Sequence, residues 1–250
     1  MREAGVMIDM NKLDFAYLIG AMLGDGWISK ENRLFFCVKD EEFIQQFVAC
    51  INRCFDTNLK YTFYFDKYHR KYFHFRTRNK EITIKLKKAF KNFDKVLKTK
   101  KEIRYFIRGF FDAEGSISKY KIAFHNSNLK IIKYIQRELL KLRFNSHLGK
   151  IEYKDGRKIE YRIWISKSYF KDFFYIIKPT ISRKRKRLLA PLLENMKLFT
   201  LREAEFIRNH WKKDLTVHQI ADHLNRNPGT MKRVCRLICK YQNYQRIKDL

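Results

Sequence analysis

The chain has 250 residues, of which 45% are hydrophobic and 16% aromatic, so an ordered protein with a packed core is expected. Lys and Arg number 55 against 26 acidic residues, and the formal net charge of +29 points to a polyanionic partner, nucleic acid rather than membrane. No apolar run reaches the length of a membrane span and no signal-peptide pattern is present, so an intracellular protein is expected.

The predicted elements follow the same order twice along the chain. Each copy begins with a helix that carries an apolar ten-residue segment, YLIGAMLGDG at 17–26 and FIRGFFDAEG at 106–115. A hairpin, a helix, a second hairpin and a closing helix then follow. In the first copy these elements are expected at 27–40, 40–55, 58–77 and 79–93. In the second copy they are expected at 116–126, 127–144, 149–166 and 166–178.

Local signals support the second copy. Ser127 is a plausible N-cap of its first internal helix, and Asp155-Gly156 is a strong turn signal between two strands. After Pro179 the pattern changes to five consecutive basic residues, 183–187, followed by helical sequence to the end. The repeating unit is therefore αββαββα, and residues 199–250 are expected to form a separate small domain.

The five cysteines predict free thiols. Cys50 and Cys54 are one helical turn apart, as are Cys235 and Cys239, and Cys37 is alone. Because no CxxC pair is present, buried thiols in a reducing compartment are favoured over a zinc site.

The repeated ten-mers predict two helices that pack at short range. Gly20 and Gly24 lie on one helical face, and Gly109 and Ala113 take the same places in the second copy. Glycine inside a helix costs about 1 kcal/mol relative to alanine, so close backbone approach is the expected compensation. The helices would end at the same level, with Gly26 and Gly115 leaving in left-handed geometry.

An acidic residue closes each of these helices. Asp25 and Glu114 stand at the carboxyl ends, where the helix dipole disfavours negative charge, and they would repel each other. Divalent cations between them would relieve both effects, because hard cations take carboxylate, water and phosphate oxygens as ligands.

With these residues in place, the chain resembles the LAGLIDADG homing endonucleases in their single-chain, two-repeat form. The resemblance covers both ten-mers and about residues 12–180. It implies an α+β fold of two pseudo-twofold-related αββαββα repeats whose saddle-shaped sheets lie in the DNA major groove. We therefore expect repeats at 12–98 and 99–180, a basic linker and helix at 181–198, and a helix-turn-helix-like domain at 199–250.

The resemblance also implies the site. Asp25 and Glu114 fall on the family's metal-binding acids, with the backbone carbonyls of Gly24 and Ala113 as further ligands. The expected ion is Mg²⁺, with Mn²⁺ as a substitute, and metal-activated water would displace the 3′ oxygen of each strand. The ten-mers differ at Leu23 and Asp112, and Asp112 is given no catalytic role.

Polar residues after the second strand of each repeat assist this chemistry in the family. By position these would be Lys39 and Asn126. The alternative is that Lys39 is only solvated and Asn126 only starts a helix.

Three surfaces are candidates for DNA contact. Strand alternation places polar and aromatic side chains on one face of each sheet, Tyr72, His74, Arg76 and Arg78 in the first and Lys158, Arg162 and Trp164 in the second. The basic run would follow a phosphate track through Arg183, Lys184 and Arg185, unless it is only a solvated linker.

The third surface is the C-terminal segment, which resembles a helix-turn-helix. Ile220, Ala221 and Leu224 would pack inward, and Pro228 would open a basic helix. The recognition residues would be Thr230, Lys232 and Arg233.

The leading hypothesis is a monomeric, site-specific endonuclease that cuts double-stranded DNA at a long, near-asymmetric target. The chain lacks the nucleophilic first residue and the His-Asn ending of an intein, so a free-standing enzyme is expected. Two alternatives use the same fold: a DNA-binding regulator without chemistry, and a maturase that binds its host intron RNA.

Overall fold

The computed structural model describes residues 10–153, 158–197, 201–211, 213–226, 228–229, 231–232 and 235. The chain divides into two compact units, Met1–Leu188 and Leu189–Leu250. The first unit contains both predicted repeats, and the predicted Asp155-Gly156 turn lies outside the described residues.

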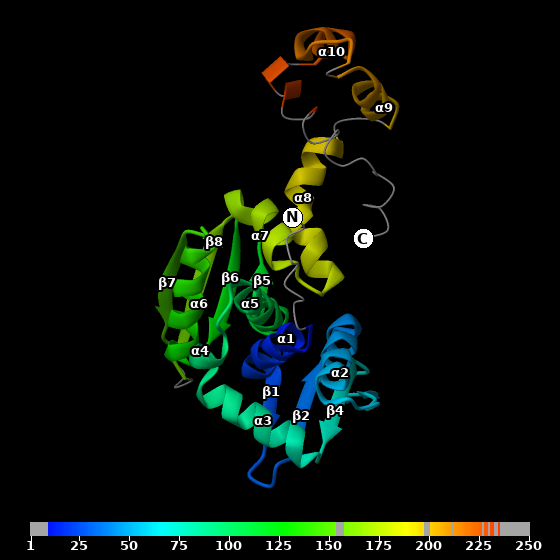
Figure 1. The fold of residues 1–250 in the computed structure, drawn as a ribbon. Coiled ribbons are helices and arrows are strands. Elements are labelled where there is room, and N and C mark those ends of the chain that lie inside the picture. The colour runs from blue at the N-terminus through cyan, green and yellow to red at the C-terminus, as the bar shows by residue number, and fades with distance from the viewer. Residues whose placement is uncertain are drawn as a thin grey trace, which may run out of the picture. The chain divides into compact units, whose positions relative to one another are not determined.

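Each repeat has the predicted αββαββα order (Figure 1). The first repeat consists of α1 (Met10–Asp25), β1 (Gly26–Ile28), β2 (Leu34–Val38), α2 (Glu41–Phe55), β3 (Thr62–Phe65), β4 (Lys71–Thr77), α3 (Lys80–Lys91) and the short α4 (Phe93–Val96). The second consists of α5 (Lys100–Glu114), β5 (Gly115–Ile117), β6 (Lys121–Asn126), α6 (Leu129–Lys141), β7 (Ser146–Ile151), β8 (Glu160–Ser166), a 3-10 turn (Lys167–Tyr169) and α7 (Phe170–Ile177). Helix α8 (Ser182–Lys197) follows.

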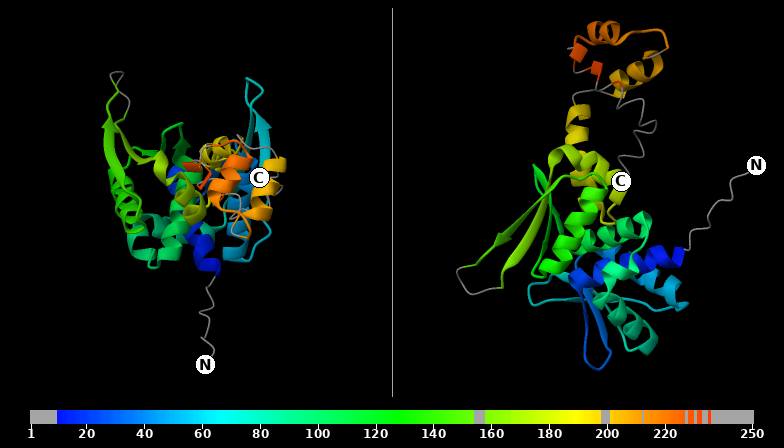
Figure 2. Two further views of the ribbon diagram at one scale, coloured as in Figure 1. Left: turned by 90° about the horizontal axis from the view of Figure 1, so that it is seen from above. Right: turned by 60° about the vertical axis from the view of Figure 1, so that its left-hand side comes forward.

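The two sheets are antiparallel and have equivalent topologies. Their strand orders are β1-β2-β4-β3 and β5-β6-β8-β7. The registers correspond as well, because Gly26 pairs with Phe36 in the first sheet and Gly115 pairs with Phe124 in the second. Figure 2 shows the sheets on either side of the central helices, with the hairpins β3–β4 and β7–β8 extending in the same direction. The α+β fold of two repeats is confirmed.

Side-chain alternation divides each sheet into a core face and an open face. Phe73 and Phe75 on β4 are buried, as are Ile163 and Ile165 on β8, and helices cover these faces. The neighbouring positions on each strand point to the opposite side and are more accessible. This is the alternation that the sequence predicted for the saddle.

Helices α1 and α5 lie side by side at the centre of the unit (Figure 1). A Cβ atom added to Gly20 would lie 2.1 Å from the carbonyl oxygen of Phe106, and one added to Gly109 would lie 2.2 Å from that of Tyr17. Backbone therefore meets backbone at these two positions, and no side chain larger than hydrogen fits. The predicted close packing of the two glycine-faced helices is confirmed.

Local capping fixes where the helices begin. Thr99 and Glu102 form a capping box at the start of α5. The expected N-cap Ser127 is wrong: the side chain of Asn128 accepts hydrogen bonds from the amides of Lys130 and Ile131 and begins α6 one residue later.

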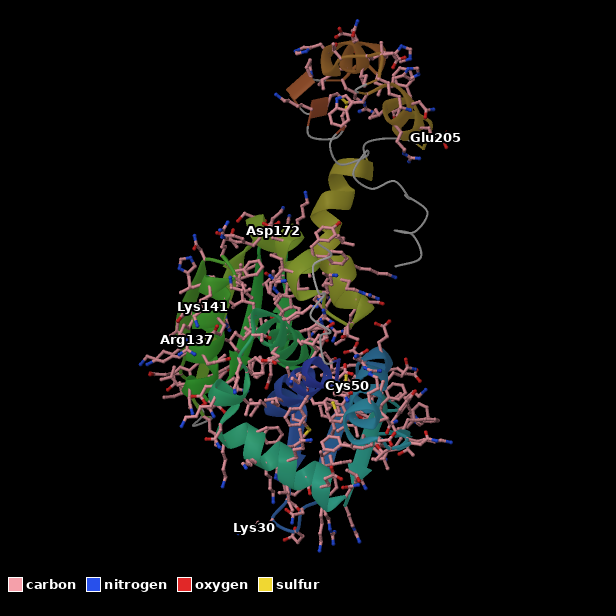
Figure 3. The ribbon with its side chains drawn as sticks, in the orientation of Figure 1. Lys30, Cys50, Arg137, Lys141, Asp172 and Glu205 are labelled. Carbon is pink, nitrogen blue, oxygen red and sulfur yellow. The ribbon has the colours of Figure 1, made fainter. Side chains whose placement is uncertain are left out.

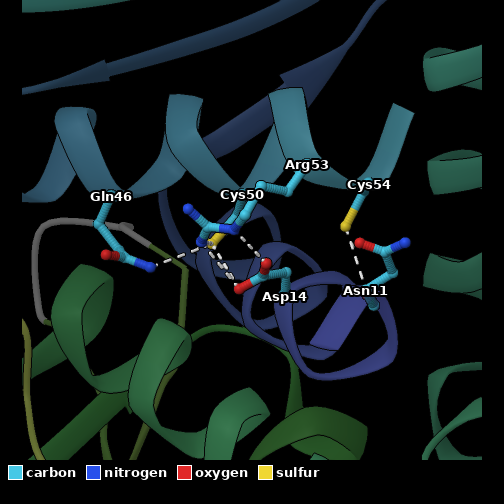
Figure 4. Close-up of polar contacts among 6 residues, drawn as sticks. All are labelled: Asn11, Asp14, Gln46, Cys50, Arg53 and Cys54. Atoms are coloured by element: carbon cyan, nitrogen blue, oxygen red, sulfur yellow. Dashed lines mark hydrogen bonds and ion pairs between the residues drawn. The ribbon is translucent and has the colours of Figure 1, made fainter. Parts of the chain in front are cut away.

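A buried carboxylate joins α1 to α2 in the first repeat (Figure 4). Asp14 is 2% exposed and accepts hydrogen bonds from Arg53 at 2.6 and 3.0 Å and from the Cys50 thiol at 3.4 Å. Burial and the neighbouring Asp14 raise the pKa of Cys50, so this thiol stays neutral. Cys50 and Cys235 are buried as expected, but Cys37 is exposed, because its strand position belongs to the open face.

Basic side chains lie at separate edges of the first unit. Figure 3 shows Lys30 in the β1–β2 turn and Arg137 and Lys141 on α6, at distant edges of this unit. Arg137 and Lys141 both donate to the buried Glu138 at 2.9 Å.

The second unit contains α9 (Leu201–His210) and α10 (Val217–His223). Thr216 and Gln219 form a capping box that begins α10. Ile207, Ile220, Ala221, Met231 and Cys235 make its small core, with Leu224 partly buried against them. The inward packing predicted for Ile220, Ala221 and Leu224 is confirmed.

Candidate active site

The carboxyl ends of the two central helices meet, and each end is a carboxylate. Asp25 is the last residue of α1, and Glu114 is the last residue of α5. A Cβ atom added to Gly24 would lie 2.4 Å from the Ala113 Cβ and 2.9 Å from the Glu114 Cγ, so the small faces continue to this end. The structure brings the two predicted acids into one site, while their metal-binding role stays a prediction.

The glycines after the acids serve a different purpose from the one expected. Gly115 has φ −82° and ψ 140°, and both glycines lead directly into strands rather than through a left-handed turn. An added Cβ at Gly26 would meet the Met22 sulfur at 2.3 Å, and one at Gly115 would meet the Phe111 ring at 2.1 Å. The prediction of left-handed backbone at these glycines is therefore wrong. Glycine is needed here for another reason: a side chain would be crowded by the preceding helical turn.

Both carboxylates are perturbed in the same direction. Burial, and after it the charge of the nearby Asp25, raise the pKa of Glu114 to about 7, and a hydrogen bond from Asn126 opposes the shift. Burial also raises the pKa of Asp25 to about 6, although part of this side chain is solvent-exposed, while Lys184 opposes the shift. The ionised form of each carboxyl group is therefore unfavourable at this position, and a bound cation would offset that free-energy cost.

The donor set fits a hard divalent cation. Among the described residues no group of three or more His, Cys, Asp and Glu side chains converges, so the site offers two carboxylates together with the carbonyl ends of two helices. Mg²⁺ and Mn²⁺ accept such oxygen ligands and complete their coordination with water and phosphate. Zinc, which prefers nitrogen and sulfur donors, has no comparable group in the same part of the chain.

The two assisting residues predicted from the sequence are not equivalent. Asn126 donates from Nδ2 to Glu114 Oε1 at 3.3 Å, so it lies at the site and does more than start a helix. Its counterpart in the first sheet is Val38, because these residues are each two positions beyond the paired Phe124 and Phe36. Lys39 is exposed, with its Nζ 5.3 Å from the centre of the Tyr72 ring. The predicted correspondence of Lys39 and Asn126 is wrong by one residue.

Lys184 is a cation at the site, although the sequence predicted that this residue contacts DNA phosphate. It is 3% exposed, and its Nζ donates to the carbonyl oxygens of Phe111 at 2.6 Å and Asp112 at 2.8 Å. Burial lowers its pKa to about 8, so it is still charged at neutral pH. The prediction that Lys184 contacts DNA phosphate is wrong, because its ammonium group is enclosed by the end of α5.

The other residues of the basic run differ in their contacts and in their exposure. Arg183 makes two hydrogen bonds to Asp40, at 2.8 and 2.7 Å, and Arg185 donates to the Ser182 hydroxyl at 2.8 Å. Lys186 and Arg187 are exposed. A continuous phosphate track through 183–185 is therefore not present, although Arg183 keeps an exposed guanidinium.

The second sheet carries a polar chain that the sequence did not reveal, and it includes Ser116, the second residue after Glu114. His125 Nδ1 lies 2.6 Å from Glu160 Oε1, its Nε2 lies 3.3 Å from the Ser116 hydroxyl, and Tyr153 donates to Glu160 at 2.8 Å. Ser116, His125 and Glu160 belong to three different strands, and none of them stands out in the sequence of its own strand. Only the β5-β6-β8 pairing brings them together, so strand alternation was the one available signal.

The open sheet faces carry most of the predicted DNA-contacting side chains. In the first sheet, Tyr72 stacks on Tyr64 with ring centres 5.6 Å apart, and Arg76 is exposed. Arg78 is exposed as well but follows β4. His74 is half-buried beside Thr62, and its pKa is lowered by burial and by Arg76.

The second open face differs in composition. Trp164 stacks on His147 with ring centres 5.7 Å apart, and Arg162 is half-buried. Lys158 is exposed but precedes β8. An unassigned aromatic pair, Trp27 and Phe35, stacks on the first face with ring centres 5.1 Å apart.

In the second unit only part of the recognition prediction is described. Lys232 is exposed in helical backbone, whereas Thr230 and Arg233 lie outside the described residues. No helix among the described residues is long and apolar enough to cross a membrane.

Comparisons with known proteins agree with this fold. A family model described as the WhiA LAGLIDADG-like domain matches residues 15–102, and one described as a LAGLIDADG-like domain matches residues 101–178. The chain therefore carries two LAGLIDADG-like domains in succession and has the LAGLIDADG two-repeat fold.

Solved structures with this fold include a homing endonuclease and a DUF199/WhiA protein. The homing endonuclease I-DmoI in complex with DNA and Mn is 22% identical with a TM-score of 0.52, covering 68% of this chain and 97% of that one. Full-length DUF199/WhiA from Thermatoga maritima is 13% identical with a TM-score of 0.52, covering 94% of this chain and 93% of that one. At these identities the likeness shows the fold alone.

Two proteins of Methanocaldococcus jannaschii are similar in sequence. One is a replication factor C small subunit, 26% identical over 226 residues, or 81% of this chain. The other is an uncharacterized protein, 36% identical over 107 residues, or 36% of this chain. The chain spans 12% of the first protein's length and 38% of the second's.

Proposed function

We propose that the chain is a site-specific, divalent-metal-dependent endonuclease that cuts double-stranded DNA. The observation that carries the proposal is the meeting of Asp25 and Glu114 at the ends of two helices in backbone contact, between two sheets with open polar faces. I-DmoI, which shares the fold, has been crystallised with DNA and Mn and with DNA and Ca. The net charge of +29 fits a long duplex partner.

The residues of the chain would divide the work as follows. Asp25 and Glu114 would hold Mg²⁺ or Mn²⁺, with the Gly24 and Ala113 carbonyls as further oxygen ligands. When bound, the metal supplies a Lewis acid and lowers the pKa of water. Asn126 orients the Glu114 carboxylate through its amide. The open faces would position the duplex, the first through Tyr72, Arg76 and Arg78 and the second through Arg162 and Trp164.

His125 would give the second repeat a proton acceptor, and its Nε2 lies 3.3 Å from the hydroxyl of Ser116, the second residue after Glu114. Its hydrogen bond to Glu160 fixes the ring orientation and lowers the pKa of Glu160. An imidazole held by a carboxylate is suited to accept a proton from water. The corresponding residue of the first sheet is Cys37, so the two halves of the site have different polar surroundings.

The test uses the full chain and a randomised duplex library. Duplexes bound in Ca²⁺ are recovered, and their cleavage is then measured in Mg²⁺, in Mn²⁺ and in EDTA. Asp25→Asn and Glu114→Gln should each slow cleavage by about two orders of magnitude or more. Affinity for the selected duplex should be kept or improved, because a negative charge facing phosphate is removed.

Asp172→Asn is the matched control, because it removes a carboxylate from an exposed position on α7 (labelled in Figure 3). It should leave cleavage and binding unchanged. A large loss of duplex affinity in the Asp25 or Glu114 variant would contradict the assigned role.

A DNA-binding regulator without chemistry is the second candidate. It is favoured by the WhiA domain model and by a neighbour that covers 94% of the chain, including the residues beyond the repeats. Under this proposal the selected duplex is bound in Mg²⁺ and Mn²⁺ and remains intact, and Asp25→Asn changes nothing except affinity.

A further inference from the structure

The segment that follows the second repeat is anchored to both repeats. We call residues 180–188 the strap. Ile181 is buried in the core of the first repeat, and Leu188 is buried in the core of the second. The strap is therefore a structural part of the first unit and crosses the end of the central helix pair.

Lys184 lies at the middle of the strap and contacts one helix end. An α-helix leaves its last four carbonyl groups without intrahelical partners. At the end of α5, the Gly115 amide donates to the Phe111 carbonyl, and the Lys184 ammonium donates to the carbonyls of both Phe111 and Asp112. A single side chain thus caps the helical turn that ends in Glu114.

The neighbouring bonds hold the strap at the same place. Asp112 is 2% exposed and accepts hydrogen bonds from the Thr180 amide at 3.0 Å and from the Tyr17 hydroxyl at 3.1 Å. Tyr17 belongs to α1, so this carboxylate connects the strap to both central helices. The feature by which the second ten-mer departs from the first, Asp112 in place of Leu23, is explained by this contact.

Enclosing an ammonium group is costly unless its donors are satisfied. Here the two short hydrogen bonds to helix-terminal carbonyls, the helix dipole and the Asp112 carboxylate all favour the cation. Among the described residues Lys184 makes no equivalent bond to the end of α1, and the hydrogen bonds of its ammonium group go to α5. The strap is a single copy, so it supports the two acids unequally.

We propose that Lys184 is a positioning residue that caps the carboxyl end of α5 and so fixes the Glu114 carboxylate at the site. The consequences for metal and DNA rest on the proposed function, whereas the cap itself does not. Removal of the ammonium group should loosen the last turn of α5 and displace Glu114 more than Asp25.

The first measurement tests the cap without metal or DNA. Hydrogen exchange is followed in the full chain by mass spectrometry of peptides covering residues 110–117. In Lys184→Met the exchange of this segment should be about tenfold faster than in the unsubstituted protein. Lys186→Met removes the same charge from an exposed position on the same helix and should change nothing. Unchanged exchange in Lys184→Met would overturn the proposal.

The second measurement uses Mn²⁺ alone, and its sign is decisive. If Lys184 acted only through its charge, its removal would strengthen Mn²⁺ binding, because a repelling cation near two carboxylates is lost. If it positions Glu114, Mn²⁺ binding should weaken by about tenfold despite that lost repulsion. Tighter or unchanged Mn²⁺ binding in Lys184→Met refutes the positioning role.

A milder variant covers the case in which Lys184→Met does not fold. Lys184→Gln keeps one amide donor for the carbonyls and should show a smaller effect of the same sign in both measurements. If the unsubstituted protein cuts its selected duplex, Lys184→Met should accumulate singly nicked DNA, because one acid is displaced more than the other. Absence of Mn²⁺ binding and cleavage in the unsubstituted protein would refute the proposed function, while hydrogen exchange still decides the cap.

Discussion

The contact between α1 and α5 makes a sharp prediction about adding one methyl group. In Gly20→Ala the new Cβ would lie 2.1 Å from the Phe106 carbonyl oxygen and 2.8 Å from the Phe110 nitrogen, both backbone atoms. Carbon and carbonyl oxygen normally approach to about 3.3 Å, so the helices must separate by about 1 Å. Overpacking of this kind costs about 3 kcal/mol when no side chain can move aside. The higher helix propensity of alanine offsets about 1 kcal/mol.

We therefore expect Gly20→Ala to lower the free energy of unfolding by about 2 kcal/mol. Gly109→Ala should do the same, since its Cβ would lie 2.2 Å from the Tyr17 carbonyl oxygen. The double variant should cost less than the sum, because helices already separated by one methyl group accommodate the second more easily.

The assay is urea unfolding of the full chain followed by tryptophan fluorescence. A Trp211→Phe background leaves Trp27 and Trp164, which both belong to the first unit. Gly149→Ala is the matched control, because it adds the same methyl group where the nearest atom, at 2.8 Å, is the far end of the Trp164 side chain. Gly20→Ala as stable as the starting protein would refute the backbone contact and the shared site that depends on it.

Three further predictions follow from the charges. Arg53→Met should destabilise the first unit by about 2 kcal/mol in the same urea assay, because it leaves the Asp14 carboxylate buried without its charged partner. Arg70→Met is the comparison, and it should have little effect, because it breaks an exposed pair with Asp66. Since the pKa values of Asp25 and Glu114 are raised to about 6 and about 7, the folded state binds more protons than the unfolded state, and metal-free stability should fall from pH 5 to pH 8. Thermal unfolding should show a larger Mg²⁺ stabilisation at pH 8 than at pH 5, and equal stabilisation would exclude these carboxylates as ligands. Removal of residues 199–250 should weaken duplex binding and flatten its salt dependence, and unchanged affinity would give that segment another role.

The two-repeat fold could be predicted from the sequence, because the glycine spacing and the strand alternation are periodic patterns and each occurs in both repeats. The spacing of Gly20 and Gly24, repeated by Gly109 and Ala113, specifies a helix face that carries at most a methyl group and therefore a partner with a similar face. Strand alternation in the same way separated Phe73 and Phe75 from the open face. Both patterns depend on local geometry, which a single sequence contains.

The site was predictable only where it depends on these helices. Asp25 and Glu114 could be placed because they end the repeated segment. Lys184 could not, since a lysine within a basic run gives no local indication that a helix end 70 residues earlier will enclose it. The same limit applies to His125 and Glu160, which meet only through the pairing of β6 with β8.

The choice between nuclease and regulator depends on what the fold itself requires at the ends of the central helices. Close packing requires Gly20, Gly24 and Gly109, and crowding requires Gly26 and Gly115, whatever the protein does. Neither requirement extends to Asp25 or Glu114. Each carboxylate opposes a helix dipole and the desolvation of its own site, and Glu114 is further opposed by the charge of Asp25.

A protein that only binds DNA would be better served at these positions by amides, which carry no charge that repels phosphate. Uncharged side chains would also need no cation to lower their cost. The two carboxylates are unfavourable for the folded protein and for bare DNA, and become favourable only when divalent cations lie between them and the phosphates. This asymmetry is the physical reason for preferring the endonuclease proposal over a regulator on the same fold.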